Sequence, residues 1–248
     1  MTDHQPATLF GVMSPNVLKV AIMLEELQRP YVLRYVGVFK GEQFTPEFLA
    51  MNPLGKVPVL QDPAFERPLA ESGAILIALA ERSGAFLPTA PTARYEVLQW
   101  LMVQMSTIGP MLGQFTHFKL LPEESDPYAR ARYAALAQRL YGLLDERLQT
   151  REWLAGDDYS IADIATFPWG EYIDRHGFDV EGYPALLRWR NQINARPAVK
   201  RAKARMAEAF IAPSTENLQS ATPADLDRFF GRTEDMPSAD YSAVTRMR

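Results

Sequence analysis

The stretch NPLGKVPVL, residues 52–60, and the stretch ESGAILIALAE, residues 71–81, decide the fold of the first third of the chain. A proline cannot donate a hydrogen bond to a sheet, so Pro58 stands at a strand start, an edge or a cis turn. The first stretch therefore predicts a strand, a second short strand follows at residues 68–70, and ESGAILIALAE opens a helix.

Strand and helix patterns alternate before this point. Residues 7–12 read as a short buried strand, and residues 17–27 carry apolar side chains at helical spacing. Residues 31–36 alternate as a strand does, and Thr45 with Pro46 opens a short helix. The order β-α-β-α-β-β-α predicts an α/β domain.

After a proline-containing linker the pattern is helical only, as far as about residue 210. A polar extension follows, in which Thr222 is the N-cap signal for one short helix. This extension is either a loosely packed tail or a flap over a site, with Phe229 and Phe230 covering it. The sequence therefore predicts an α/β domain at residues 1–86, an all-α domain at 92–210 and a C-terminal extension at 211–248.

The composition is that of an ordinary globular protein, with 47% hydrophobic and 23% charged residues among 248. The formal net charge of -4 argues against a nucleic-acid partner. The absence of cysteine excludes disulfides and a catalytic thiol of the protein's own, and the histidines lack ligand spacing, so we expect no metal site. No signal peptide or membrane-length apolar run is present, so we expect a cytoplasmic protein without membrane contact.

Ser14-Pro15-Asn16 lies where the first strand gives way to the first helix. Free backbone N–H groups and the positive end of the helix dipole stabilise a thiolate at such a place. Since the chain has no cysteine, that thiol must belong to a ligand. Lowering a thiol pKa by ~1–2 units takes only ~1.4–2.7 kcal/mol, which the dipole, the Ser14 hydroxyl and the Asn16 amide together supply. The alternative is that Ser14 or Asn16 simply caps the helix.

Two further positions fit a peptide-like ligand. A cis Val57–Pro58 bond would turn the Val57 backbone outward to pair with an extended ligand, although an ordinary turn proline explains the sequence as well. Glu71 and Ser72, at the start of the next helix, suit the ammonium and carboxylate of an α-amino acid, or form a second helix cap. By contrast, Ser160 and Asp163 predict a structural capping box, and a basic cluster predicts a solvated helix face: Arg196, Lys200, Arg201, Lys203 and Arg205.

In this order the signals resemble a cytosolic glutathione transferase over about residues 7–210. NPLGKVPVL, ESGAILIALAE and DYSIADIA at residues 158–165 are similar to that family's signatures. The resemblance implies a thioredoxin-like N-terminal domain followed by an all-α helical bundle. Within the family, three stretches resemble the nu class and its fungal nitrogen-regulator relatives: residues 13–27, 35–49 and 99–118.

The resemblance also implies where glutathione binds. Ser14, where the class usually has Thr, and Asn16 would flank the sulfur, and Gly55 replaces an Asn that is frequent in the class. The resemblance implies that Val57, before cis-Pro58, pairs with the cysteinyl backbone and that Glu71 and Ser72 hold the γ-glutamyl end. It also implies that Gln43 and Lys56 hold the glycyl carboxylate and that Arg132 is a further contact.

The nu-class resemblance implies a homodimeric, glutathione-dependent disulfide-bond reductase with weak transferase activity. Reduced or oxidised glutathione would occupy each site, as one or two molecules. Attack at sulfur needs a thiolate and a good leaving thiol but no strong general base, which agrees with a site that has neither His nor Cys. Two alternatives stay open: a transferase or ether-cleaving lyase that acts on electrophilic carbon, and a non-catalytic glutathione-binding regulatory module.

Overall fold

The computed structural model describes residues 5–120, 126–233, 235–236, 239–241 and 244. The first four residues of the predicted N-terminal domain and the last four of the extension lie outside them. The chain forms two compact units. The sheet unit comprises Met1–Ile75 and Arg201–Arg248, and the helical unit comprises Leu76–Lys200. The residues after 200 thus belong to the same unit as the start of the chain.

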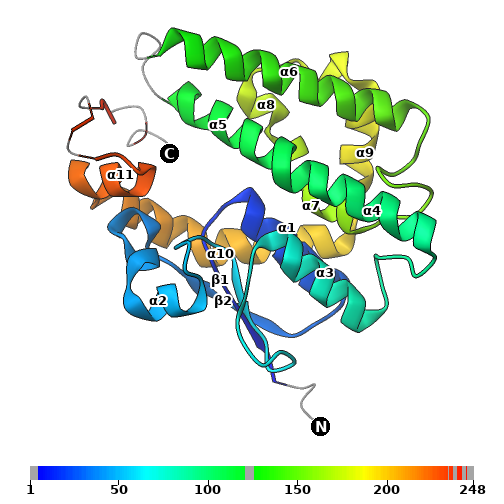
Figure 1. The fold of residues 1–248 in the computed structure, drawn as a ribbon, viewed down its shortest axis with the longest axis horizontal. Coiled ribbons are helices and arrows are strands. Elements are labelled where there is room, and N and C mark those ends of the chain that lie inside the picture. The colour runs from blue at the N-terminus through cyan, green and yellow to red at the C-terminus, as the bar shows by residue number, and fades with distance from the viewer. Residues whose placement is uncertain (1–4, 121–125, 234, 237–238, 242–243, 245–248) are drawn as a thin grey trace. The chain divides into compact units, whose positions relative to one another are not determined.

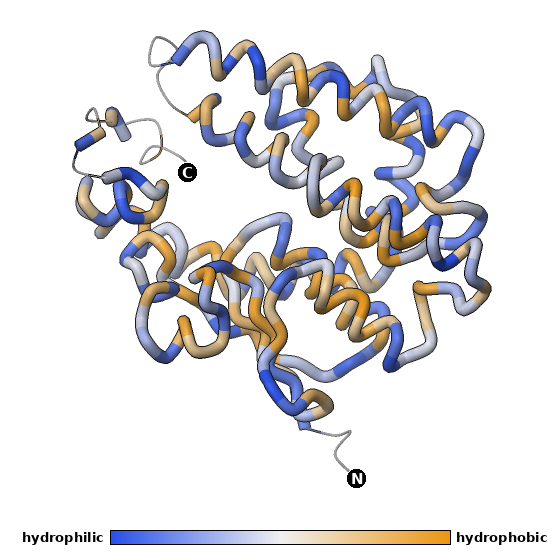
Figure 2. The backbone as a smooth tube through the Cα atoms, in the orientation of Figure 1, coloured by the Kyte–Doolittle hydropathy of each residue, from blue (hydrophilic) through white to orange (hydrophobic). Residues whose placement is uncertain are grey.

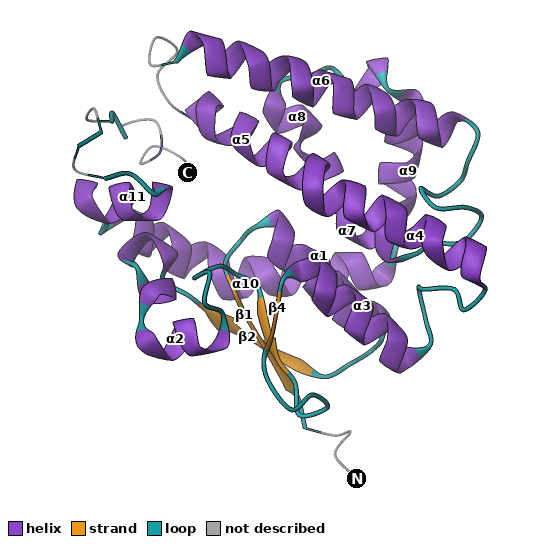
Figure 3. Ribbon diagram, viewed as in Figure 1, coloured by secondary structure: helices purple, strands orange, loops and turns teal. Residues whose placement is uncertain are grey.

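A four-stranded mixed sheet forms the centre of the sheet unit, in the order β2-β1-β3-β4 (Figure 3). Strand β1 (Ala7–Gly11) pairs in parallel with β2 (Tyr31–Tyr35) and antiparallel with β3 (Val59–Gln61), which pairs antiparallel with β4 (Leu69–Ala70). The central strands are apolar (Figure 2), and burial is complete for Leu9 of β1. This topology confirms the predicted strand order.

Helices complete the sheet unit in the predicted sequence. Proline at the first turn and a Ser or Thr cap begin both α1 (Pro15–Glu26) and α2 (Pro46–Met51). Helix α3 (Ser72–Ser83) completes the predicted β-α-β-α-β-β-α region. Helices α10 (Pro197–Gln219) and α11 (Pro223–Phe230) follow much later in the chain. Two 3-10 turns that the sequence did not predict lie between β2 and α2: η1 (Val38–Lys40) and η2 (Glu42–Phe44). The predicted boundary at residue 210 falls inside α10.

Glu25, at the end of α1, ties α10 to the sheet unit. Its carboxylate is 8% exposed and accepts hydrogen bonds from Arg201 Nε at 2.7 Å and Arg205 Nη1 at 2.9 Å. The Tyr31 hydroxyl donates a third, at 3.1 Å. Arg201 and Arg205, whose side chains are 50% and 41% exposed, lie on the solvated face predicted for the basic cluster and also pair with this buried carboxylate.

Helix α3 spans the boundary between the two units at Ile75 and Leu76, and the helical unit continues with a long helix that is interrupted once. Between α4 (Pro91–Val103) and α5 (Gly109–Leu120) the backbone forms a π-helical turn, η3 (Gln104–Ile108), in which Gly109 N donates to Gln104 O (Figure 1). Pro110 has no N–H to give to residue 106, which explains why the helix is irregular just before it. The other elements are α6 (Pro127–Gln149), α7 (Ile161–Gly170), α8 (Tyr172–His176), η4 (Val180–Gly182) and α9 (Pro184–Ala195).

Asp163 organises the helical unit from its interior. It is fully buried, and its carboxylate accepts hydrogen bonds from Ser160 N at 3.1 Å, Leu154 N at 2.9 Å and Trp189 Nε1 at 2.9 Å. The predicted capping box is present, and it also joins α7 to α9. None of the described helices is both long enough and apolar enough to cross a membrane.

Replacing Glu25 with Gln should lower the free energy of unfolding by about 1.5–3 kcal/mol at neutral pH, since it weakens hydrogen bonds to a charged group. Burial raises the pKa of Glu25, but its bonds to the two arginines and Tyr31 outweigh burial and hold the pKa below 4.5. The stabilisation is present above 4.5 and disappears as pH falls through the depressed pKa. In urea unfolding experiments, the free energies of unfolding of the wild type and of the Glu25→Gln variant should therefore converge at acidic pH.

The exposed Glu66→Gln variant is the matched control and should unfold like the wild type at every pH. Equal stability of the Glu25→Gln variant and the wild type at neutral pH would contradict the role given to this carboxylate.

Candidate functional site

Helix α1 starts directly behind β1 because the two elements approach very closely. A Cβ atom on Gly11 would lie 2.6 Å from Val17 Cγ1, which is too close for any side chain. Glycine therefore lets the chain turn from strand to helix within three residues, and the N-terminus of α1 lies beside the end of the strand.

Ser14 is the N-cap of α1. Its backbone is extended and its Oγ accepts a hydrogen bond from Val17 N at 3.4 Å. Because a hydroxyl can accept and donate at once, the Ser14 proton remains available to an acceptor in front of the helix. Ser14 and Asn16 are both partly exposed, and Met13 is 47% exposed. The capping interpretation is confirmed, and it is compatible with stabilisation of a ligand thiolate.

The Val57–Pro58 peptide bond is cis, as the family resemblance implied. Val57 is half-buried, and among the described residues its backbone N–H and C=O find no hydrogen-bond partner. The preceding loop is held by Asn52, whose Nδ2 donates to Lys56 O at 2.8 Å and whose Oδ1 accepts from Leu54 N at 3.1 Å. Sequence reasoning missed Asn52. The Val57 backbone is left to pair with an extended ligand.

Glu71 and Ser72 stand at the N-terminus of α3. Glu71 is exposed and adopts a φ of 66°, a left-handed conformation that is rare for residues other than glycine and is concentrated at ligand sites. Ser72 is 4% exposed. The first turn of α3 therefore presents backbone donors next to an exposed carboxylate, an arrangement that suits the zwitterionic end of an amino acid.

Lys19 lies beneath this turn, and sequence reasoning missed it. It is 1% exposed on α1, and its Nζ donates to Ser72 Oγ at 3.4 Å. Burial removes water from the ammonium and lowers the pKa of Lys19 to about 7, although the Glu71 carboxylate opposes the shift. A lysine inside the otherwise apolar run VLKVAIM was the available signal. When protonated, it adds positive charge behind the N-terminus of α3.

The remaining predicted contacts occupy different settings. Gln43 is 3% exposed, and its Nε2 donates to Val38 O at 3.0 Å within the turns between β2 and α2. Its Oε1 is buried without a hydrogen-bond partner among the described residues. Lys56 is exposed beside the cis proline, and Arg132 is exposed on α6 of the helical unit. The structure thus brings Ser14, Asn16, Lys56, Val57, Pro58, Glu71, Ser72 and Gln43 into one unit, and Arg132 belongs to the other.

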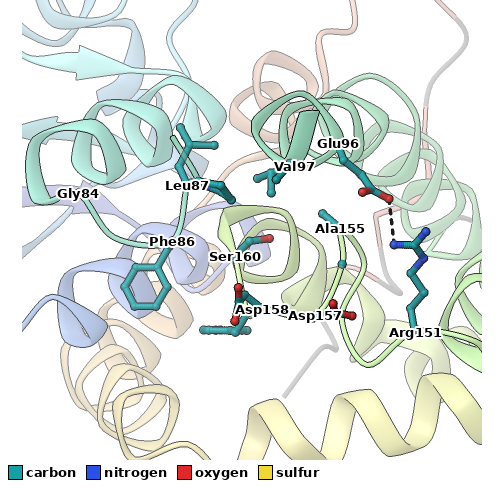
Figure 4. A pocket seen from close by; sticks show the side chains of 14 residues that line it. Gly84, Phe86, Leu87, Glu96, Val97, Arg151, Ala155, Asp157, Asp158 and Ser160 are labelled. Carbon is teal, nitrogen blue, oxygen red and sulfur yellow. Dashed lines mark ion pairs between the residues drawn. The ribbon is translucent and has the colours of Figure 1, made fainter. Parts of the chain in front are cut away.

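The helical unit contains a pocket of about 490 Å³ between the linker after α3, the start of α4 and the loop before α7 (Figure 4). Two of its charged groups are paired with each other: Glu96 forms an ion pair with Arg151 at 3.3 Å. The Tyr159 ring packs under Arg196, 4.0 Å from the guanidinium carbon. These walls serve the packing of the unit, and we assign no ligand to the pocket. Within the described residues, no cluster of His, Asp or Glu could hold a metal ion.

Residues 13–82 match the glutathione S-transferase N-terminal domain, and residues 96–197 match the glutathione S-transferase C-terminal domain. This chain belongs to the glutathione S-transferase family. The disulfide-bond oxidoreductase YfcG of Escherichia coli strain K12 is 44% identical over 199 residues, which cover 78% of this chain and 93% of the relative. The disulfide-bond oxidoreductase YghU of the same strain is 34% identical over 245 residues, covering 93% and 84%.

Among solved structures, a glutathione transferase family member from Pseudomonas fluorescens pf-5, with two glutathione bound, superposes with a TM-score of 0.73. It is 44% identical, and the match covers 79% of this chain and 91% of that one. The family and the two-domain fold class expected from the sequence are confirmed.

Replacing Lys19 with Met should change how stability depends on pH. Between pH of about 7 and 10.5 an unfolded lysine keeps a proton that folded Lys19 has lost. The free energy of unfolding of the wild type should therefore rise with pH in this window relative to the variant, by up to about 1.4 kcal/mol per pH unit. Denaturant unfolding across the window measures the difference.

The exposed Lys200→Met variant serves as control and should keep the pH dependence of the wild type. If the free energy of unfolding depends on pH in the same way in the wild type and in the Lys19→Met variant, Lys19 is not neutral above pH of about 7.

Proposed function

We propose that this protein is a glutathione-dependent disulfide-bond oxidoreductase with weaker glutathione transferase activity. The observation that carries the proposal is the open N-terminus of α1, with Ser14 and Asn16 beside it, in a chain without cysteine. The site is built for a thiolate that the protein does not possess. Glutathione supplies it, as in the family, and the similar YfcG and YghU are both disulfide-bond oxidoreductases.

The reaction needs two thiolates in succession. The first glutathione thiolate attacks one sulfur of the substrate disulfide, the S–S bond breaks, and the other sulfur leaves as a thiolate that takes up a proton. A second glutathione thiolate then attacks the glutathione sulfur of the mixed disulfide, which releases the second substrate thiol and forms glutathione disulfide. Substrate gains the two electrons that the two glutathiones lose. The related Pseudomonas structure, with two glutathione bound, supports this stoichiometry.

The chain's own residues orient the glutathione and hold its charge. The hydroxyl of Ser14, the amide of Asn16 and the helix dipole lower the pKa of the bound thiol, which increases the fraction of attacking thiolate. The Val57 backbone pairs with the cysteinyl residue, and Glu71 and Ser72 receive the γ-glutamyl end. Gln43 and Lys56 serve the glycyl end, and Arg132 makes a further glutathione contact, as nu-class membership would imply.

Replacing Asn16 with Ala should reduce kcat/KM for glutathione-driven reduction of hydroxyethyl disulfide by about 10–150-fold. The change removes one donor from the sulfur, equivalent to about 1.5–3 kcal/mol. Replacing Ser14 with Ala should have a smaller effect, because Asn16 and the helix dipole remain. Steady-state assays of disulfide reduction, and of chloronitrobenzene conjugation for comparison, measure both.

Asn191→Ala, an exposed change on α9, is the matched control and should keep full activity. Full activity of both Ser14→Ala and Asn16→Ala would mean that the sulfur lies elsewhere. Rapid attack on carbon with little disulfide turnover would favour a transferase or ether-cleaving lyase. Binding of glutathione without turnover in either assay would favour a regulatory module.

We further propose that the protein is a cytoplasmic homodimer with a glutathione-binding domain at residues 1–86, an all-α domain at 92–210 and an extension at 211–248. The apolar side chains along the long helix from α4 to α5 divide into two sets: Leu101, Ile108 and Leu112 are buried, whereas Met102 is 49% exposed. Tyr95, one heptad before Met102 on α4, is 68% exposed. An exposed apolar face at this spacing supports α4 as the contact between copies.

Met102→Glu should convert the dimer to monomer in sedimentation-velocity experiments, because a charge would be buried in the contact. Ile211→Glu places the same charge at an exposed apolar position on α10 and should leave the dimer intact. If Met102→Glu sediments as the wild type does, α4 is not the dimer contact.

A further inference from the structure

We propose that the C-terminal segment is a positioning element of the glutathione site. We define the C-terminal segment as residues 211–233 and the glutathione loop as residues 37–44. The segment holds the loop in the conformation that binds the glycyl end of glutathione. Both belong to the sheet unit. The inference rests on the proposed function, and it replaces the two sequence interpretations of the extension, a loose tail or a flap, with a structural support.

Hydrogen bonds attach the C-terminal segment to the backbone of the glutathione loop. Phe39 N donates to Asn217 Oδ1 at 3.0 Å, and Lys40 Nζ donates to Ser220 O at 3.1 Å. The Lys40 ammonium also lies 3.9 Å from an Asp225 carboxylate oxygen at the start of α11. The loop contains two short 3-10 turns and internal hydrogen bonds such as that from Gly37 N to Glu42 Oε2 at 2.6 Å, and the contacts from the C-terminal segment add to these.

Apolar packing attaches the same two segments. The rings of Phe39 and Phe229 lie 4.7 Å apart between centroids, and α11 packs along η1 (Figure 1). Phe229 also packs against the buried cluster of Val36, Val38, Phe48 and Val59, and Val57 packs against that same cluster. One ring of the C-terminal segment thus supports both the loop that contains Gln43 and the residue before the cis proline.

The side chain of Arg228 on α11 lies against Gly41 of the glutathione loop. Gly41 has a φ of 82°, and a Cβ atom there would lie 2.9 Å from Arg228 Nη1. Helix α11 is itself well terminated, by a capping box of Thr222 and Asp225 and by Gly231 in the left-handed conformation. Tyr241, which is 8% exposed, donates to Asp227 and steadies the helix further.

The position of Gln43 explains why this support matters for binding. Gln43 lies inside the loop, with Nε2 donating to Val38 O and Oε1 lacking a partner among the described residues. Its placement is therefore set by the shape of the loop. A loop already held in its binding form saves the ligand the entropy of ordering it. Loosening the C-terminal segment should weaken contacts to the glycyl end and leave the α1 and α3 contacts intact.

The test compares two ligands by isothermal titration calorimetry: glutathione and γ-glutamylcysteine, which lacks the glycyl residue. Asn217→Ala removes the acceptor of the Phe39 amide, and Phe229→Ala removes the shared ring. Each should raise the Kd of glutathione about tenfold, as expected for the loss of one ordering contact, and change that of γ-glutamylcysteine less than about twofold. Hydrogen exchange should show faster exchange of the Phe39 amide in both variants.

Gln219→Ala, an exposed amide on the same helix, is the matched control and should bind both ligands as the wild type does. Phe229→Leu keeps apolar bulk in the cluster and should restore most of the affinity. Unchanged glutathione affinity in Asn217→Ala and Phe229→Ala overturns the inference, and so does an equal loss for both ligands. Failure of the wild type to bind glutathione would instead overturn the proposed function itself.

Discussion

The close approach of Gly11 to Val17 is the constraint on which the site depends. With no side chain at residue 11, the chain leaves β1 and enters α1 at once, and the helix N-terminus is set beside the edge of the sheet. The antiparallel pairing of β1 with β3 brings the cis Val57–Pro58 bond to the same region, since Phe10 is paired with Val59. One strand therefore positions both the helix N-terminus proposed to stabilise the sulfur and the Val57 backbone proposed to pair with the ligand.

The electrostatics of the candidate site follow from two helix N-termini and one buried lysine. The N-terminus of α1 can offer hydrogen bonds and a dipole to a thiolate, and that of α3 can offer the same to a carboxylate, with Lys19 behind it adding positive charge when it is protonated. No group here needs to remove a proton as a strong base would. That matches sulfur exchange, whose rate depends on thiolate fraction and leaving group.

Local signals were readable from the sequence, and distant pairings were not. Pro58, the Ser160–Asp163 box and the Thr222 cap each act within a few residues, so composition and spacing predict them. Asn217 contacts Phe39 and Arg201 contacts Glu25 across about 180 residues, and no local pattern encodes such a pairing. The extension therefore looked loose in sequence, although three-dimensional contacts attach it to the sheet unit. The family resemblance supplied the site residues that isolated motifs left ambiguous.

The lack of cysteine affects how the protein withstands oxidation. An enzyme whose reactive thiol is its own side chain is inactivated when that sulfur is oxidised beyond the disulfide level. In the proposed reaction the reactive sulfur arrives with glutathione and leaves with it, so an over-oxidised molecule is exchanged and the polypeptide is unharmed. The thioether of Met13, which is 47% exposed next to Ser14, is a sulfur of the chain that oxidation can reach, and its oxidation is reversible. The proposed reaction thus suits repeated turnover under oxidising conditions.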